Sequence, residues 1–185
     1  MNKYIATSAM LALVSGGASA GGIDRSGQTL GALFEEGNYV ELSFGSISPD
    51  VSGTAIGTGS GDMASRYSQF GGAYKRDIND QLSFALIFDQ PFGANVDYPT
   101  GTGYVFSGAT AELTTNALTG ILRYKMDNGF SVHGGVRLQT LEANVGIPAV
   151  ASYTGVGERD ESFGYLVGAA YEKPEIAMRI ALTYF

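Results

Sequence analysis

The stretch that decides the fold runs from residue 80 to residue 98 and reads DQLSFALIFDQPFGANVDY. Within residues 81–89, large apolar side chains alternate with small, polar or mixed ones, and a period of two is typical of a β-strand. A tilted strand of about nine or ten residues is long enough to cross the hydrocarbon layer of a bilayer. The stretch therefore predicts a strand with one apolar face, preceded by a short polar turn and followed by a long loop.

The same unit recurs through the chain, and we expect seven strands. They cover residues 38–48, 67–76, 81–89, 104–126, 130–145, 162–172 and 176–185. Short connections at residues 77–80, 127–129 and 173–175 alternate with long loops, the last of which ends in the charged residues 158–161. Short periplasmic turns and long external loops are typical of outer-membrane barrels, whereas loop lengths in a soluble β-sandwich need not alternate. The pattern predicts an all-β, antiparallel transmembrane β-barrel, with a soluble sandwich as the alternative.

Composition excludes several classes of protein. The 185 residues include no Cys, so a disulfide framework and a thiolate metal site are excluded. The net charge of −7 argues against nucleic acid as a partner. Beyond residue 23, no uncharged run reaches the roughly 18 residues that a spanning helix requires. The 27 Gly, 11 Tyr and 10 Phe favour β structure over helix.

The chain divides into three parts. Residues 1–20 have the pattern of a signal peptide, with Lys3 before an apolar core and a small-residue cleavage site at residues 18–20. Residues 21–37 form a short N-terminal arm with an apolar patch at Leu30, Leu33 and Phe34; it either plugs a barrel or hangs loose. Residues 38–185 are the barrel portion. We expect an exported protein in a Gram-negative outer membrane.

An odd number of strands raises a problem of closure. Single-chain bacterial barrels have even strand numbers, and an open edge in lipid leaves backbone groups without partners. Either residues 104–118 hide an additional strand, or the chain is part of a longer barrel. We interpret the sequence as a truncated one.

One stretch of the sequence resembles a known protein family. DQPFGANVDYP at residues 89–99 is similar to the FadL/TodX-type outer-membrane transporters of long-chain fatty acids and hydrocarbons. Supporting stretches are GAYK (72–75), AEL (111–113), LRYK (122–125), SVHGGVR (131–137) and PEIAMRI (174–180). The resemblance implies a fourteen-stranded barrel with an N-terminal hatch, passing apolar ligands from outside to a lateral opening in the wall. This chain would be its N-terminal half, with a short hatch that lacks the family's Asn-Pro-Ala element.

A ligand of this class needs an apolar sleeve for its tail and one or two polar groups for its head. Our candidates for the sleeve are Leu33, Phe34, Phe92, Tyr98, Tyr104 and Phe106. Our candidates for binding a carboxylate head group are Arg123 and Arg137, and Lys75 and Arg179 are further cations expected in the lumen. The alternative for the aromatic residues is loop packing or an interfacial girdle. The alternative for the cations is that they are solvated, or paired with other residues, in a polar interior.

We expect no catalytic residue, metal site or cofactor. His133 has Ser131 two residues away on the same strand face, which suggests an outer-membrane lipase or acyltransferase. However, side chains at i and i+2 diverge along the pleat, and no orienting carboxylate is evident. The glycine-rich residues 57–62 lack the Lys and the following helix of a phosphate loop.

The function that we expect is passive uptake of long-chain fatty acids or other hydrophobic molecules through an outer-membrane channel. Its partners would be that ligand and outer-membrane lipid, with no nucleic acid, and the full-length protein would be monomeric. The alternative is a small eight-stranded outer-membrane barrel with a structural or adhesive role. The interior of eight strands is filled by side chains, whereas a wider barrel leaves room for a ligand.

Overall fold

The computed structural model describes residues 23–150 and 152–185, and the predicted signal peptide, residues 1–20, lies outside them. The elements are η2 (Gly31–Phe34), β1 (Tyr39–Ile47), β2 (Thr54–Ala55), β3 (Thr58–Gly59), β4 (Tyr67–Asp77), β5 (Leu82–Asp89), β6 (Gly93–Asp97), β7 (Thr110–Lys125), β8 (Phe130–Ile147), β9 (Tyr153–Lys173), η3 (Pro174–Ile176) and β10 (Met178–Tyr184). Both η elements are short 3₁₀ helices. Within the described ranges, no helix is long and apolar enough to cross a membrane.

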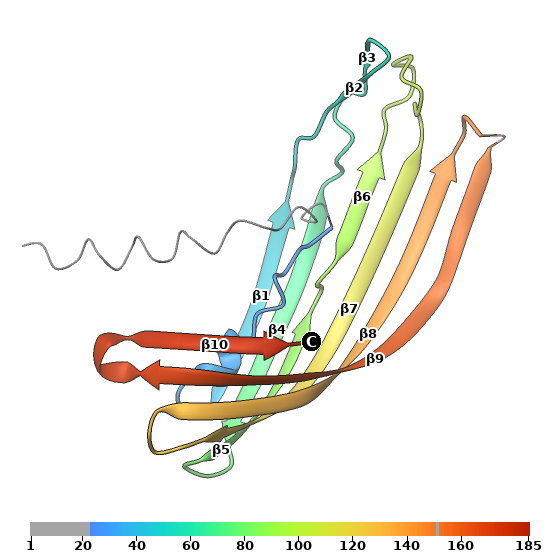
Figure 1. Cartoon of the computed structure of the whole chain (residues 1–185). Coiled ribbons are helices and arrows are strands. Elements are labelled where there is room, and N and C mark those ends of the chain that lie inside the picture. Colours follow the sequence, from blue (N-terminus) through green and yellow to red (C-terminus); the bar gives the residue numbers. More distant parts are fainter. Residues whose placement is uncertain (1–22, 151) are drawn as a thin grey trace, which may run out of the picture.

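The strands form one antiparallel sheet in the order β1-β4-β5-β7-β8-β9-β10, with β6 also paired to β7. The lower halves of β8, β9 and β10 curl around, so that the sheet has the shape of half a barrel, and the N-terminal arm lies on its inner side (Figure 1). The predicted antiparallel half-barrel of seven strands is confirmed. A small separate hairpin, β2–β3, lies in the loop between β1 and β4.

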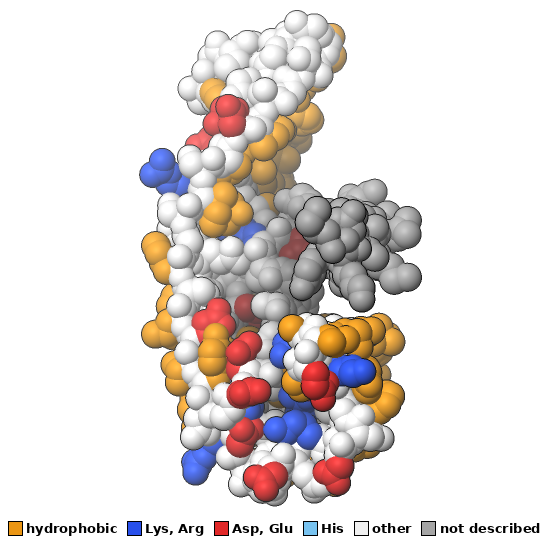
Figure 2. All heavy atoms as spheres, turned by 90° about the vertical axis from the view of Figure 1, so that its left-hand side faces the viewer, with side chains coloured by type: hydrophobic (Ala, Val, Ile, Leu, Met, Phe, Trp, Pro, Cys, Tyr) orange, Lys and Arg blue, Asp and Glu red, His pale blue; other side chains and the backbone are white. Residues whose placement is uncertain are grey.

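The two faces of the sheet differ in chemistry. The outer face exposes large apolar side chains, among them Leu42 at 76%, Phe163 at 74% and Leu182 at 80% exposure. The inner face buries Lys75, Arg123 and small hydroxyl residues. Figure 2 shows charged side chains gathered in the lower half of the molecule, with apolar side chains along its margins. This is the alternation that the sequence predicts.

The three predicted short connections are present. In the first, Asn79 accepts a hydrogen bond from the backbone N–H of Leu82 at 2.7 Å. The second places Gly129 at φ +83°, a conformation that suits glycine. The third is η3, which is followed by Ala177 with φ +50°.

Two details of the predicted connections are wrong, and one of the two alternatives for the odd strand count is excluded. The predicted third long loop is instead an extended hairpin, in which β8 runs to Ile147, β9 begins at Tyr153, and the charged residues 158–161 belong to β9. Its Gly and Val residues remain compatible with pairing, and the irregularity is limited to a register shift between Leu141 and Ala143. The predicted loop at residues 90–103 contains β6. Residues 104–118 hide no separate strand, because residues 110–118 are the first half of β7.

Both ends of the sheet are open. Among the described strands, β1 pairs only with β4 and β10 only with β9. Since β1 and β10 are the first and last of seven successively antiparallel strands, they run in the same direction. They are therefore unsuited to pair with each other in an antiparallel ladder, and an antiparallel closure requires an odd number of further strands.

Close packing of β7 against β8 depends on a glycine. A Cβ added at Gly135 would lie 2.2 Å from the carbonyl oxygen of Gly120 and 3.0 Å from Cα of Ile121. Backbone atoms of a paired strand have little room to retreat. Gly164, on the adjacent strand β9, has open space around the same position.

We predict that Gly135→Ala destabilises the folded sheet by about 1–3 kcal/mol, because the new methyl group forces β7 and β8 apart. Thermal unfolding of the purified full-length protein in detergent, followed by circular dichroism, measures the effect. Gly164→Ala is the matched control and should change the unfolding temperature little. Equal unfolding temperatures for the two variants would contradict the prediction.

Candidate functional site

The third strand of the sheet is interrupted. β5 ends at Asp89 and β6 begins at Gly93, yet both pair with β7, so they are two pieces of one strand. Pro91, in the break, has no N–H to donate to a ladder. On the other side, β4 pairs with β5 only over Gly72–Asp77, and residues 67–71 pair with β1 alone. The wall therefore has a gap between the upper half of β4 and β6.

Backbone of the N-terminal arm occupies this gap. Asp24 forms a bridge with Phe92, the N–H of Arg25 donates to the carbonyl of Pro91 at 2.8 Å, and the N–H of Gly93 donates to the carbonyl of Ile23 at 2.8 Å. From β4, the side-chain amide of Gln69 donates to the carbonyl of Arg25 at 3.0 Å. The arm thus replaces part of the missing strand pairing.

The side chain of Arg25 crosses the same gap. Its guanidinium carbon lies 3.8 Å from the ring centroid of Tyr67 on β4, and Nη2 donates to Oδ1 of Asn95 on β6 at 2.9 Å. A Cβ on Gly93 would lie 2.3 Å from that guanidinium carbon, so only glycine leaves room for it. Burial lowers the pKa of Arg25, and the nearby Tyr67 and Glu112 oppose the shift. An arginine remains charged in proteins at any ordinary pH.

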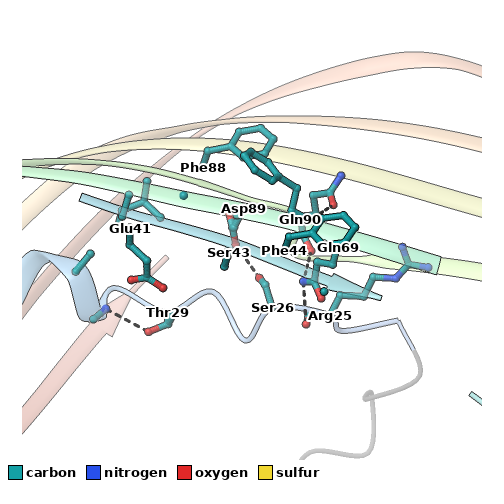
Figure 3. A pocket seen from close by; sticks show the side chains of 18 of the residues that line it. Arg25, Ser26, Thr29, Glu41, Ser43, Phe44, Gln69, Phe88, Asp89 and Gln90 are labelled. Atoms are coloured by element: carbon teal, nitrogen blue, oxygen red, sulfur yellow. Dashed lines mark hydrogen bonds between the residues drawn. The ribbon is translucent and has the colours of Figure 1, made fainter. Parts of the chain in front are cut away.

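A cleft of about 540 Å³ lies between the arm and the inner face of β1, β4 and β5 (Figure 3). Small residues on the strands leave this space: Ser43, Gly45, Gly71 and Ala73. The arm side includes Ser26, whose hydroxyl donates to Asp89 Oδ2 at 2.7 Å. An outer groove of about 270 Å³, framed by Leu42, Tyr74 and Leu118, shares Phe70, Gly72 and Phe88 with the cleft. The cleft and the outer groove thus lie on opposite faces of the same part of the sheet, next to the gap.

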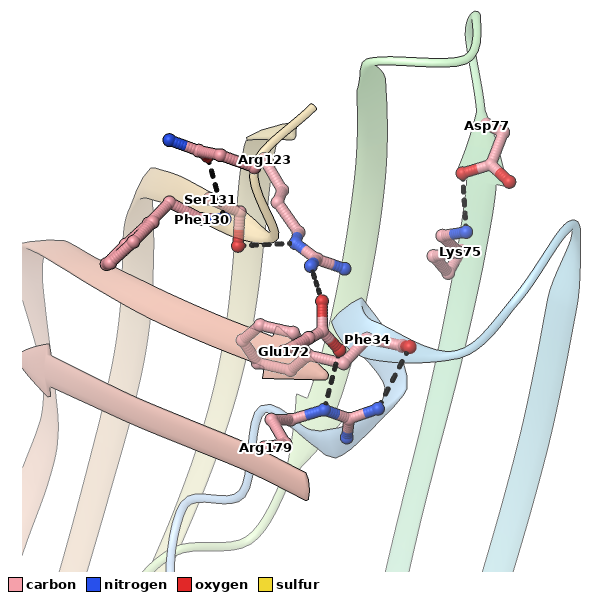
Figure 4. A network of polar contacts seen from close by, with 9 residues as sticks. Phe34, Lys75, Asp77, Arg123, Phe130, Ser131, Glu172 and Arg179 are labelled. Atoms are coloured by element: carbon pink, nitrogen blue, oxygen red, sulfur yellow. Dashed lines mark hydrogen bonds and ion pairs between the residues drawn. The ribbon is translucent and has the colours of Figure 1, made fainter. Parts of the chain in front are cut away.

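The lower end of the arm is held by ion pairs and cations (Figure 4). The ring of Phe34 lies between two guanidinium carbons, Arg123 at 4.6 Å and Arg179 at 4.8 Å from the centroid. Glu172 pairs with both arginines, and Arg179 also donates to the carbonyl of Phe34 at 3.1 Å. Lys75, 1% exposed, pairs with Asp77 and donates to the carbonyl of Gly37 at 2.7 Å.

The predicted ligand residues fall into separate groups. Leu33 and Phe34 are buried in a core with β5, β7 and β9, and Phe92 lies in the break of the third strand. The rings of Tyr98, Tyr104 and Phe106 contact one another in the loop after β6, with centroids 5.3–6.2 Å apart.

The predicted cations are engaged with protein groups. Arg123 pairs with Glu172, and Arg137 lies 3.4 Å from Asp89 and donates to Thr119 at 3.3 Å. Nε of Arg137 is buried with no hydrogen-bond partner among the described residues.

His133 and Ser131 have other partners. Nε2 of His133 lies 2.9 Å from the hydroxyl of Thr183, while the hydroxyl of Ser131 accepts a hydrogen bond from Arg123 at 3.1 Å. Ser131 thus joins β8 to the neighbouring β7, whereas His133 reaches across β9 to β10.

Sequence reasoning missed Arg25, Gln69 and Asn95. The sequence of the arm is an ordinary polar segment, and no motif in it indicates contact with β4 or β6. The available signal was Pro91 followed by Gly93 within an otherwise strand-like stretch, because both residues mark interruptions of a strand.

Comparison with known proteins supports the fold. No protein-family model and no curated protein matches the chain. Among solved structures, the chain is similar to that described as a Pseudomonas aeruginosa FadL homologue, with a TM-score of 0.51 and 21% identity. The match covers 74% of this chain and 39% of the other, so the chain spans well under half of the protein that it resembles. The likeness supports a FadL-like fold.

The buried Lys75–Asp77 pair yields a prediction about stability. We expect Asp77→Asn to cost about 3 kcal/mol of folding free energy, because it leaves the buried ammonium of Lys75 with neutral acceptors and no counter-charge. Denaturant unfolding of the full-length protein in detergent measures this cost. Asp80→Asn, an exposed residue of the same turn, is the control and should be close to neutral. The double variant Lys75→Met/Asp77→Asn should recover part of the loss; no loss in Asp77→Asn would contradict the account.

Proposed function

We propose that this chain forms part of the wall of an outer-membrane channel for passive uptake of long-chain fatty acids or other hydrophobic molecules. The observation that carries the proposal is the gap in the third strand, with a cleft inside it and an apolar groove outside it. No chemical step is required of the protein.

The outer face supports a place in lipid. Phe130, Val132, Val136 and Leu138 follow one another along the outer side of β8, each 41–51% exposed. Eight residue steps extend roughly 27 Å along a strand. A tilt of about 40° reduces that to about 20 Å, close to the apolar band of about 25 Å in outer-membrane barrels. Large contiguous apolar patches are rare on water-facing surfaces.

The open edges favour a wide barrel over the eight-stranded alternative. A closed eight-stranded barrel would pair its first strand with its last, whereas β1 and β10 run in the same direction. One further antiparallel strand would give eight strands with an interior filled by side chains, whereas three or more would leave a wider lumen. The likeness to a FadL homologue of which this chain covers 39% favours the wider barrel. We propose that the complete wall is contributed by one full-length protein, located in the Gram-negative outer membrane after removal of residues 1–20.

The proposed route begins at the loop aromatics and ends in the bilayer. Tyr98, Tyr104 and Phe106 would capture an apolar tail, since together they present three contacting rings outside the strands. The ligand would then enter the cleft between the arm and the inner face of β1, β4 and β5. Phe92 and the gap would give it passage through the wall into lipid.

This proposal predicts a specific loss of uptake. In cells that carry the full-length protein, replacing Tyr98, Tyr104 and Phe106 together by Ala should slow the initial uptake of a radiolabelled C16 fatty acid about tenfold, because the capture surface is lost. Cells without the protein give the baseline.

The control is Tyr153→Ala, which removes an exposed aromatic side chain from the β8–β9 hairpin and should leave uptake unchanged. Surface levels of each variant are compared by immunoblot of outer membranes. Fatty-acid uptake at the baseline rate in cells with the unmodified protein would refute the proposed function.

A further inference from the structure

The outer face of the sheet changes its chemistry abruptly within β7, β8 and β9. One row of side chains that pair across these strands is apolar: Leu118, Leu138 and Phe163. The next row on the same face, two residues closer to the β8–β9 hairpin, is polar: Asn116, Thr140 and Glu161. Side chains at i and i+2 share a face of a strand, so the apolar band of the outer face ends between these two rows.

The polar part of this face contains a pocket. Glu112 pairs with Asn95 on one side and with Asn144 on the other, and it lies an even number of residues from Leu118 along the unbroken strand β7. The three paired side chains therefore point outward, above the apolar band. With four neighbouring residues they line a pocket of about 210 Å³. This volume is several times the roughly 30 Å³ that one water molecule occupies in the liquid.

The height of the pocket separates one class of lipid from another. The six residue steps from Leu118 to Glu112 extend roughly 20 Å along the strand. A tilt of about 40° reduces this to about 15 Å along the membrane normal. The head-group region of a phospholipid bilayer extends only about 5–8 Å beyond the hydrocarbon on each side. A phospholipid therefore ends below the pocket, whereas a lipid whose head group carries several sugars reaches it.

The lining of the pocket suits neutral hydroxyl groups. It combines the amides of Asn95 and Asn144, the carboxylate of Glu112 and the hydroxyls of Ser65 and Thr110. A hydroxyl both donates and accepts hydrogen bonds, as an amide side chain does, and a carboxylate accepts strongly from it. Arg25 donates to Oδ1 of Asn95 at 2.9 Å, so the N–H groups of that amide remain available as donors. The negative charge of Glu112 disfavours a phosphate in the same place.

We propose that this pocket binds the sugar hydroxyls of an outer-leaflet glycolipid. The acyl chains of that lipid lie against the apolar band at the level of Leu118 and Leu138, and its head group rises along the polar face to Glu112 and Asn144. The pocket is thus a lipid site on the outside of the wall, separate from the cleft inside it. This inference rests on the membrane position in the proposed function, and not on transport, and it adds a specific lipid partner.

The test measures binding of fluorescent rough-type lipopolysaccharide, a glycolipid with several sugars in its head group, to the purified full-length protein in detergent. Loss of two hydrogen-bonding groups in Glu112→Ala/Asn144→Ala should weaken this binding about tenfold. Both side chains are exposed, so the double variant should fold. The matched control is Asn38→Ala/Glu175→Ala, which removes the same two exposed groups at the opposite end of the sheet and should bind like the unmodified protein.

A phospholipid probe separates the head group from the acyl chains. Fluorescent phosphatidylethanolamine should bind equally to all three proteins, because its head group ends below the pocket. Three results would overturn the site: no binding of lipopolysaccharide to the unmodified protein, equal affinity of the double variant and the control for it, or an equal loss of affinity for both lipids. Uptake of the C16 fatty acid by the double variant should match that of the unmodified protein, so failure of the lipid site and failure of the channel are distinguishable.

Discussion

Every backbone N–H and C=O of a lipid-facing sheet needs a hydrogen-bond partner within the protein, because hydrocarbon supplies none. The ladders between neighbouring strands meet this demand over most of the wall. They fail at the break after Asp89, where Pro91 cannot donate and β4 loses its neighbour. There the arm supplies the missing groups through Ile23 and Arg25. The arm thus completes the hydrogen bonding of the wall at this break.

The two ends of the arm are held by interactions of different strength. At the lower end, Phe34 is enclosed by Arg123 and Arg179, which share Glu172, and Lys75 binds the carbonyl of Gly37. At the upper end, Arg25 contacts the neutral Asn95 and Tyr67, has Glu112 nearby, and forms a few backbone hydrogen bonds. Because a buried charge that loses its partner is costly, the lower end is the more firmly held of the two.

The sequence predicted the wall better than it predicted the site. Alternation with a period of two identified all seven strands of the sheet and their apolar faces, since it follows directly from strand geometry. It misjudged residues 146–161, because pairing can continue between strands that carry Gly, Val and charged side chains. Phe34 and Arg123 were each singled out as ligand residues, yet their mutual contact depends on how the sheet curls. Arg25 and Asn95, 70 residues apart, have no local signal that connects them.

A closed wall requires that β1 and β10 are internal strands, each paired on both sides. Hydrogen exchange of the full-length protein in lipid bilayers, resolved to individual amides of Tyr39–Ile47 and Met178–Tyr184, tests this directly. If further strands pair with both, the amides that lack a partner in the present sheet will exchange as slowly as those of β4 and β9. Rapid exchange along either strand would show an open edge and contradict the closed barrel.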